Sequence, residues 1–170
     1  MTYEINFKKI LTIIGVATSL GVFYNLISDN SVDFIRTEKV YKMVEDSSIS
    51  IDLNQTIIEP RLISIEQAYQ LFSSQSAIFI DSRDKWDFSD GHIPGAINIP
   101  EYNFDPGSKI VTNLDHKNLY IIYCNSDDCE TSKKLANELL KLSFNKLLIF
   151  ESGWDSWILK NYPIEKSELQ

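Results

Sequence analysis

Residues 119–150 constrain the fold more than any other part of the chain, because two apolar runs there flank one amphipathic stretch. The runs, residues 119–123 and 147–150, have the length and composition of strands that are buried on both faces. Between them, residues 130–142 repeat leucine at the spacing of one helical face. A strand, a helix and a strand in this order pack as a βαβ unit with parallel strands. The segment therefore predicts an α/β domain with helices on both faces of a parallel sheet.

The preceding residues extend the same alternation of strand and helix. Residues 77–80 form a third short apolar run, which predicts another buried strand. Ser64 and Gln67 have the spacing of a capping box, so we expect a helix over residues 65–72. With 170 residues, of which 44% are hydrophobic, the chain has material for one domain and an attached segment.

Charge and composition exclude several classes of function. The chain carries 16 Lys and Arg against 24 Asp and Glu, for a net charge of -8, so we expect no nucleic acid as a partner. Two cysteines and two histidines are too few for a four-cysteine zinc site or a disulfide-dense scaffold.

Residues 10–27 form an 18-residue run without a charged side chain. As a helix the run would be about 27 Å long, which nearly matches the roughly 30 Å hydrocarbon core of a bilayer. Lys8 and Lys9 precede it, which favours a cytoplasmic N-terminus and an extracytoplasmic (periplasmic or extracellular) C-terminal domain, although cations at positions 36, 39 and 42 oppose this orientation. A cleaved signal peptide and a buried core helix are the alternatives to a retained membrane anchor.

These observations divide the chain into five parts. We expect a cytoplasmic tail (residues 1–9), a transmembrane helix (10–27), a juxtamembrane stalk (28–59), the α/β domain (60–166) and a C-terminal tail (167–170). Within the stalk, residues 48–53 alternate polar and apolar side chains, which indicates a short strand.

Cys124 is the candidate nucleophile. It directly follows the apolar run 119–123, and active sites of open parallel sheets lie beyond the carboxyl ends of strands. We expect the backbone N–H groups of the following loop and first helical turn to stabilise a sulfur anion. The residues that supply these amides are Asn125, Ser126, Asp127, Asp128, Cys129 and Glu130. The alternative for a single cysteine is an inert, buried residue.

Two separate blocks of sequence resemble the rhodanese homology domain. The first block is Ile80–Asp84, Trp86, Phe88 and Gly91–Pro100, and the second is Tyr123–Cys124 with its loop, Leu147–Trp154, Trp157 and Tyr162–Ile164. The first is similar to the family's Asp-x-Arg strand end and its GHIPGA segment. The second is similar to the family's active-site loop and its closing glycine-tryptophan segment. Together they cover residues 61–165.

The resemblance implies a single-domain sulfurtransferase with a five-stranded parallel sheet flanked by helices. Cys124 would carry sulfane sulfur as a persulfide, taking it from a small donor and passing it to a thiol or another nucleophile. Asp81 and Arg83 would form an ion pair that shapes the site, and His92 would have a structural hydrogen-bonding role. No metal or cofactor is implied.

The loop departs from the family pattern in charge. Many members place Gly and a base within it, whereas this loop carries Asp127, Asp128 and Glu130 and no base. An acid about 6 Å from the sulfur would raise the pKa of the Cys124 thiol by roughly 0.5 to 2 units, against the effect of the amides. We therefore expect weak use of the dianion thiosulfate and better use of thiol persulfides or polysulfides.

The second departure is Cys129, a further cysteine five residues after Cys124. It is a possible resolving residue, which could form a disulfide with Cys124, or else a buried residue at the start of the helix. The alternative function is therefore a non-catalytic binding or redox-sensing module that uses a Cys124/Cys129 thiol-disulfide switch. A phosphatase or arsenate reductase is disfavoured, because such a site needs a cation at the end of the loop and position 130 is Glu.

Overall fold

The computed structural model describes residues 7–27, 41, 59–126 and 130–167. The chain divides into two units, residues 1–39 and 40–170. The expected strand at residues 48–53 and most of the expected stalk lie outside the described residues.

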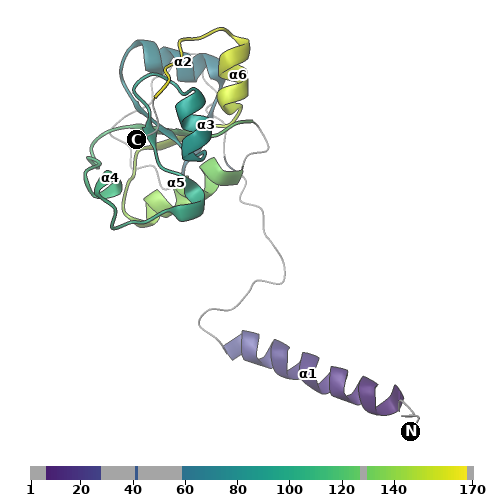
Figure 1. Ribbon diagram of the computed structural model, residues 1–170. Coiled ribbons are helices and arrows are strands. Elements are labelled where there is room, and N and C mark those ends of the chain that lie inside the picture. The colour runs from purple at the N-terminus through teal and green to yellow at the C-terminus, as the bar shows by residue number, and fades with distance from the viewer. Residues whose placement is uncertain (1–6, 28–40, 42–58, 127–129, 168–170) are drawn as a thin grey trace. The chain divides into compact units, whose positions relative to one another are not determined.

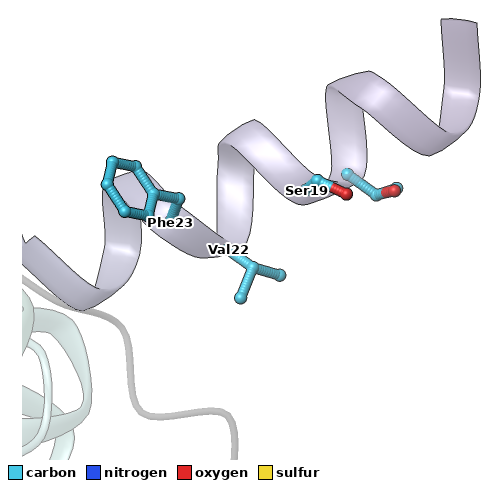
Figure 2. Close-up of a pocket in the computed structure, with 4 residues that line it drawn as sticks. Ser19, Val22 and Phe23 are labelled. Atoms are coloured by element: carbon cyan, nitrogen blue, oxygen red, sulfur yellow. The ribbon is translucent and has the colours of Figure 1, made fainter.

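The first unit contains the apolar helix α1, Phe7–Ile27. Its apolar side chains are exposed, and the window Phe7–Asn25 is long and apolar enough to cross a membrane. The Thr18 hydroxyl donates to the Ile14 carbonyl at 2.9 Å, and the Ser19 hydroxyl donates to the Gly15 carbonyl at 2.8 Å. Figure 2 shows Ser19, Val22 and Phe23 projecting from this helix. Because both hydroxyls are bonded within the helix, neither would face hydrocarbon without a partner.

The second unit is built on a five-stranded, fully parallel sheet in the order β1-β5-β4-β2-β3. The strands are β1 Arg61–Ile63, β2 Ile78–Asp81, β3 Ile97–Asn98, β4 Tyr120–Tyr123 and β5 Leu147–Phe150. All four residues of β4 and of β5 are buried, because these strands lie inside the sheet and helices cover both faces.

The helices of this unit are α2 Ile65–Ser73, α3 Lys85–Asp90, the 3-10 turn η1 Glu101–Asn103, α4 Lys109–Thr112, α5 Glu130–Lys141 and α6 Gly153–Leu159. The predicted capping box at α2 is confirmed, since the Gln67 N–H donates to Ser64 Oγ and the Ser64 N–H donates to Gln67 Oε1. It begins the helix at the residue that the sequence predicts.

Two apolar clusters cover opposite faces of the sheet, because successive residues of a strand point in opposite directions. Tyr120 and Ile122 of β4 belong to the cluster that includes buried side chains of α4 and α5. Ile121 and Tyr123 belong to the cluster that includes α2 and α6. In Figure 1, α2 and α6 lie together on one side of the domain and α4 and α5 on the other. This is the α/β architecture, with helices on both faces, that the sequence predicts.

Candidate active site

Three neighbouring strands end at the same level of the sheet. The register aligns Asp81 of β2 with Tyr123 of β4, and Tyr123 with Phe150 of β5. The residues that follow, Ser82, Cys124 and Glu151, therefore begin the loops at one edge. Cys124 is the central one of the three because β4 lies between β2 and β5.

The sulfur of Cys124 is fully buried, but Cys124 belongs to neither apolar cluster. Its Sγ lies 3.5 Å from Oγ of Ser132 and 3.8 Å from the carbonyl oxygen of Ser126. In this structure the sulfur is part of a disulfide. The environment of the sulfur is thus closed to solvent and partly polar.

The loop after Cys124 is described at its two ends. Asn125 and Ser126 are exposed, and Glu130 is the exposed first residue of α5. The remaining predicted loop residues, Asp127, Asp128 and Cys129, lie outside the described residues. The contacts of the loop amides with the sulfur, and a resolving role for Cys129, therefore stay predictions.

The start of α6 holds the backbone of Cys124. The Trp154 N–H donates to the Cys124 carbonyl at 2.7 Å, and the Asp155 N–H donates to the Asn125 carbonyl at 2.8 Å. Gly153 has φ +56°, and a Cβ at this position would lie 2.4 Å from the Cys124 carbonyl oxygen. A glycine is required here both for the backbone angle and for the close approach of the two segments.

Asp81 and Arg83 form the buried ion pair expected from the sequence. The Arg83 Nη2 lies 2.7 Å from Asp81 Oδ2, and the Nε donates to Oδ1 at 3.0 Å. The same Nη2 donates to the Gly91 carbonyl at 2.7 Å, and Nη1 donates to Asn125 Oδ1 at 3.4 Å. The pair therefore connects the end of β2 to the loop that follows Cys124.

Aromatic rings enclose the guanidinium of Arg83. Its Cζ lies 4.8 Å from the ring centroid of Trp154 and 5.9 Å from that of Tyr123, within cation–π range. Burial by itself would lower the pKa of Arg83, but hydrogen bonding to Asp81 and its charge raise that pKa above the ordinary value. Arg83 is thus a fixed cation, and its carboxylate partner neutralises it.

The comparisons with known proteins identify the family to which this fold belongs. Residues 64–160, more than half of the chain, match the model of the rhodanese-like domain. The chain belongs to the rhodanese-like domain family. It is 23% identical over 103 residues to the thiosulfate sulfurtransferase GlpE of Glaesserella parasuis, which covers 61% of this chain and 91% of that protein.

Two other relatives of this rhodanese-like protein are uncharacterised. An uncharacterised protein of Buchnera aphidicola subsp. Baizongia pistaciae is 28% identical over 86 residues, or 51% of this chain and 58% of that protein. The protein YibN of Escherichia coli K12 is 26% identical over 109 residues, or 64% of this chain and 74% of that protein. This chain therefore spans less than two thirds of the Buchnera protein.

Solved structures share the fold. The protein BH2092 of Bacillus halodurans superposes with a TM-score of 0.56 at 24% identity, covering 61% of this chain and 74% of that one. A rhodanese-related protein of Thermoplasma volcanium has a TM-score of 0.51 at 23% identity, covering 63% and 99%. At these identities the likeness establishes the architecture alone.

A second cation of this rhodanese-like domain lies on α5 and is also paired. The Lys133 ammonium lies 2.8 Å from Glu151 Oε1 and 5.9 Å from the ring centroid of Tyr41. Its hydrogen bond to Glu151 raises the pKa of Lys133. Asn137 of the same helix donates to the Tyr41 hydroxyl at 2.7 Å. The sequence does not identify these contacts, because Tyr41 lies far from α5 along the chain.

His92 is buried and has a structural environment. Its Nδ1 lies 2.7 Å from the Phe88 carbonyl, and its ring stacks on Phe88 at 3.7 Å between centroids. Its backbone pairs with that of Glu165, which joins the GHIPGA segment to the end of the domain. Among the residues that the structure describes, no cluster of three or more His, Cys, Asp or Glu could hold a metal ion.

Proposed function

We propose that the protein is a sulfurtransferase in which Cys124 carries sulfane sulfur. The Cys124 thiolate attacks the outer sulfur of a donor persulfide, so that a bond to Sγ forms while the donor's S–S bond breaks and leaves a thiolate. An acceptor thiolate then attacks the same sulfur atom, and the electron pair of the broken bond returns to Sγ. The two steps balance without an oxidant or a cofactor.

The position of Cys124 carries this proposal. The residue follows the central strand, precedes α5 and has its own carbonyl held by the N–H of Trp154. Its sulfur lies beside polar atoms of Ser126 and Ser132 and outside both apolar clusters. An inert core cysteine does not require such surroundings, whereas a sulfur that becomes an anion does.

Charge pairing supports a donor with little negative charge. Both cations described above are neutralised, Arg83 by Asp81 and Lys133 by Glu151. The loop itself adds acidic residues. A dianion such as thiosulfate would therefore meet no uncompensated positive charge from these two groups, and we infer that thiol persulfides or polysulfides are the preferred donors.

Mass spectrometry of the full-length protein in detergent tests the proposal. After reduction and treatment with glutathione persulfide, we expect one added sulfur on Cys124, which an added thiol removes. The Cys124→Ser protein should gain none, and the Cys129→Ser protein should still gain one. Absence of the adduct would contradict the carrier role of Cys124. Thiosulfate turnover equal to that of glutathione persulfide would contradict the donor preference.

A thiol–disulfide switch is the second candidate, and the oxidised state of Cys124 favours it. In this function, reduction of the disulfide by an external thiol would change the loop without moving sulfur to another molecule. The same mass spectra discriminate the candidates, because a switch loses two hydrogens on oxidation and gains no sulfur from the persulfide.

We further propose that α1 tethers the protein to a membrane with the rhodanese-like domain on the extracytoplasmic side. The exposed apolar side chains of α1, its length and Lys8 and Lys9 support this proposal. A cleaved signal peptide is distinguished by the N-terminal sequence of the mature protein, which would then begin within or after the apolar run of residues 10–27.

A further inference from the structure

Ser132 occupies an unusual place on α5. The buried residues of this helix are Ser132, Leu135, Ala136 and Leu139, which repeat at the i, i+3, i+4 and i+7 positions of one face. Three of the four are apolar and the first, nearest the active-site loop, is a serine that is 1% exposed. A hydroxyl in that position needs a hydrogen-bonding partner, and Cys124 Sγ lies 3.5 Å from it.

The two polar atoms next to the sulfur differ in what they can do. The Ser126 carbonyl, at 3.8 Å, is an acceptor and would repel negative charge on the sulfur. The Ser132 hydroxyl can donate, and a donor stabilises the charged form of a thiol. Of these two contacts, the one from Ser132 favours a thiolate.

The adjacent hydroxyl on α5, that of Thr131, contacts Ser82. Ser82 donates its hydroxyl hydrogen to the Tyr123 carbonyl at 2.8 Å, so the 3.0 Å contact between Ser82 and Thr131 has the Thr131 hydroxyl as its donor. Thr131 and Ser132 are thus neighbouring hydroxyls of one helical turn, and they contact different groups, Ser82 and the sulfur of Cys124.

We propose that the Ser132 hydroxyl donates a hydrogen bond to Cys124 Sγ when this sulfur is an anion. The inference rests on the proposed sulfur transfer, in which Sγ is an anion twice: before it attacks the donor, and when the acceptor removes the outer sulfur. Ser132 therefore assists both the formation and the discharge of the persulfide, from the helix side of the site.

The size of the effect follows from the acidity of the thiol. A hydrogen bond to the charged form lowers the pKa of a group such as Cys124 by about one unit. At a pH below the pKa, this raises the fraction of thiolate about tenfold. Nucleophilicity falls with basicity at a slope of roughly 0.4 to 0.5. Removing the hydroxyl should therefore slow attack by Cys124 about threefold at low pH. At a pH high enough to ionise Cys124 in both the parent and the variant, it should speed the attack about threefold.

Several charged groups lie on the elements around the sulfur, and none of them is changed in the test. They are Asp81 at the end of β2, Arg83 after β2, Glu130 and Lys133 on α5, Glu151 after β5 and Asp155 on α6.

The experiment measures the rate of alkylation of Cys124 by iodoacetamide as a function of pH. It uses full-length, reduced protein in detergent with Cys129→Ser, so that one thiol remains. We expect Ser132→Ala to raise the pKa of Cys124 by about one unit, with rate profiles that cross those of the parent. Thr131→Val removes the neighbouring hydroxyl and should leave that pKa unchanged.

Two further variants separate the hydrogen bond from packing. Ser132→Thr keeps the hydroxyl, whereas Ser132→Val has the shape of threonine without the hydroxyl. Only the valine variant should therefore shift the pKa of Cys124. Equal pKa values for this pair, a uniform loss of rate at every pH, or an equal shift in Thr131→Val would overturn the proposal. Alkylation needs no sulfur donor, so a failed sulfur transfer would leave this result interpretable.

Discussion

Gly153 occupies a position where the backbone angle and the neighbouring chain both exclude a side chain. Its φ is +56°, and an added Cβ would meet the carbonyl oxygens of Cys124 and Asn125 at 2.4 and 2.9 Å. Gly95 offers a matched comparison, since its φ is +74° and nothing lies within 4 Å of an added Cβ. A comparison of the two glycines separates the cost of backbone strain from the cost of displacing the backbone at Cys124.

We expect Gly95→Ala to lower the free energy of unfolding by about 1 to 2 kcal/mol, the cost of a left-handed backbone for alanine. Gly153→Ala should cost more and should also reduce the yield of the Cys124 persulfide, because the backbone of Cys124 must move. Urea unfolding and mass spectrometry measure the two effects. Equal losses of stability in both variants would show that the contact with Cys124 adds nothing to the cost of the substitution at Gly153.

The Asp81–Arg83 pair predicts a different pattern of stability. Arg83→Met leaves a carboxylate that is 0% exposed without its cation, and such a loss costs about 3 to 5 kcal/mol. The double variant Asp81→Asn, Arg83→Met should cost clearly less than the sum of the two single changes. As a control, Glu138→Ala removes the exposed pair with Lys141 and should cost less than about 1 kcal/mol. Additive losses at Asp81 and Arg83 in urea unfolding would contradict a coupled pair.

At the scale of elements, three strands and two helices are predictable from local pattern. The apolar runs became β2, β4 and β5, and the helix expected over residues 130–142 is α5, Glu130–Lys141. The edge strands β1 and β3 have three and two residues, too few for a periodic signal, and they form by pairing with β5 and β2. Their existence follows from the family resemblance and not from local sequence.

For the candidate site too, sequence pattern predicts some features and not others. The places of Cys124, Asp81 and Arg83 follow from strand ends, which sequence pattern identifies. The contacts of Cys124 with Trp154 and Ser132 do not, because the first depends on how α6 meets the loop and the second on the angle of α5. A serine on an otherwise apolar helical face is the signal that could have identified Ser132.

Tyr123 of strand β4 makes the free energy of unfolding depend on pH in the alkaline range. Burial and the charge of Asp81 raise the pKa of Tyr123 above its ordinary value of 10.0, and the Ile93 N–H donates to its hydroxyl. Above pH 10 the unfolded chain loses this proton while the folded chain keeps it, so the stabilisation is complete below that pH and lost as pH rises. Tyr123→Phe should weaken this decline in urea unfolding measured from pH 8 to 11. An unchanged slope would assign the decline to other groups.

At the scale of the whole molecule, α1 predicts association with membranes. Replacing Leu11 and Val16 by lysine puts two charges within the apolar segment, each costing about 2.5 to 3.5 kcal/mol at the centre of a bilayer. We expect the variant Leu11→Lys, Val16→Lys to move from the membrane pellet to the supernatant after alkaline extraction. Leu11→Ile, Val16→Leu is the apolar control and should remain in the pellet. Retention of the lysine variant would contradict anchoring through α1.

Orientation is a separate prediction for the intact protein. With the domain extracytoplasmic, a protease added to cells with a permeable outer layer should cut within residues 60–166 and leave residues 1–9 protected. Cleavage of the N-terminal residues alone would reverse the assignment.

The carbonyl of Cys124 is held by Trp154, and the backbone of His92 pairs with Glu165 near the end of the domain. Trp154 and Glu165 follow Cys124 and His92 in the chain, so the ribosome makes both partners later. The backbone of Cys124 therefore takes its folded position only after the start of α6 has been translated.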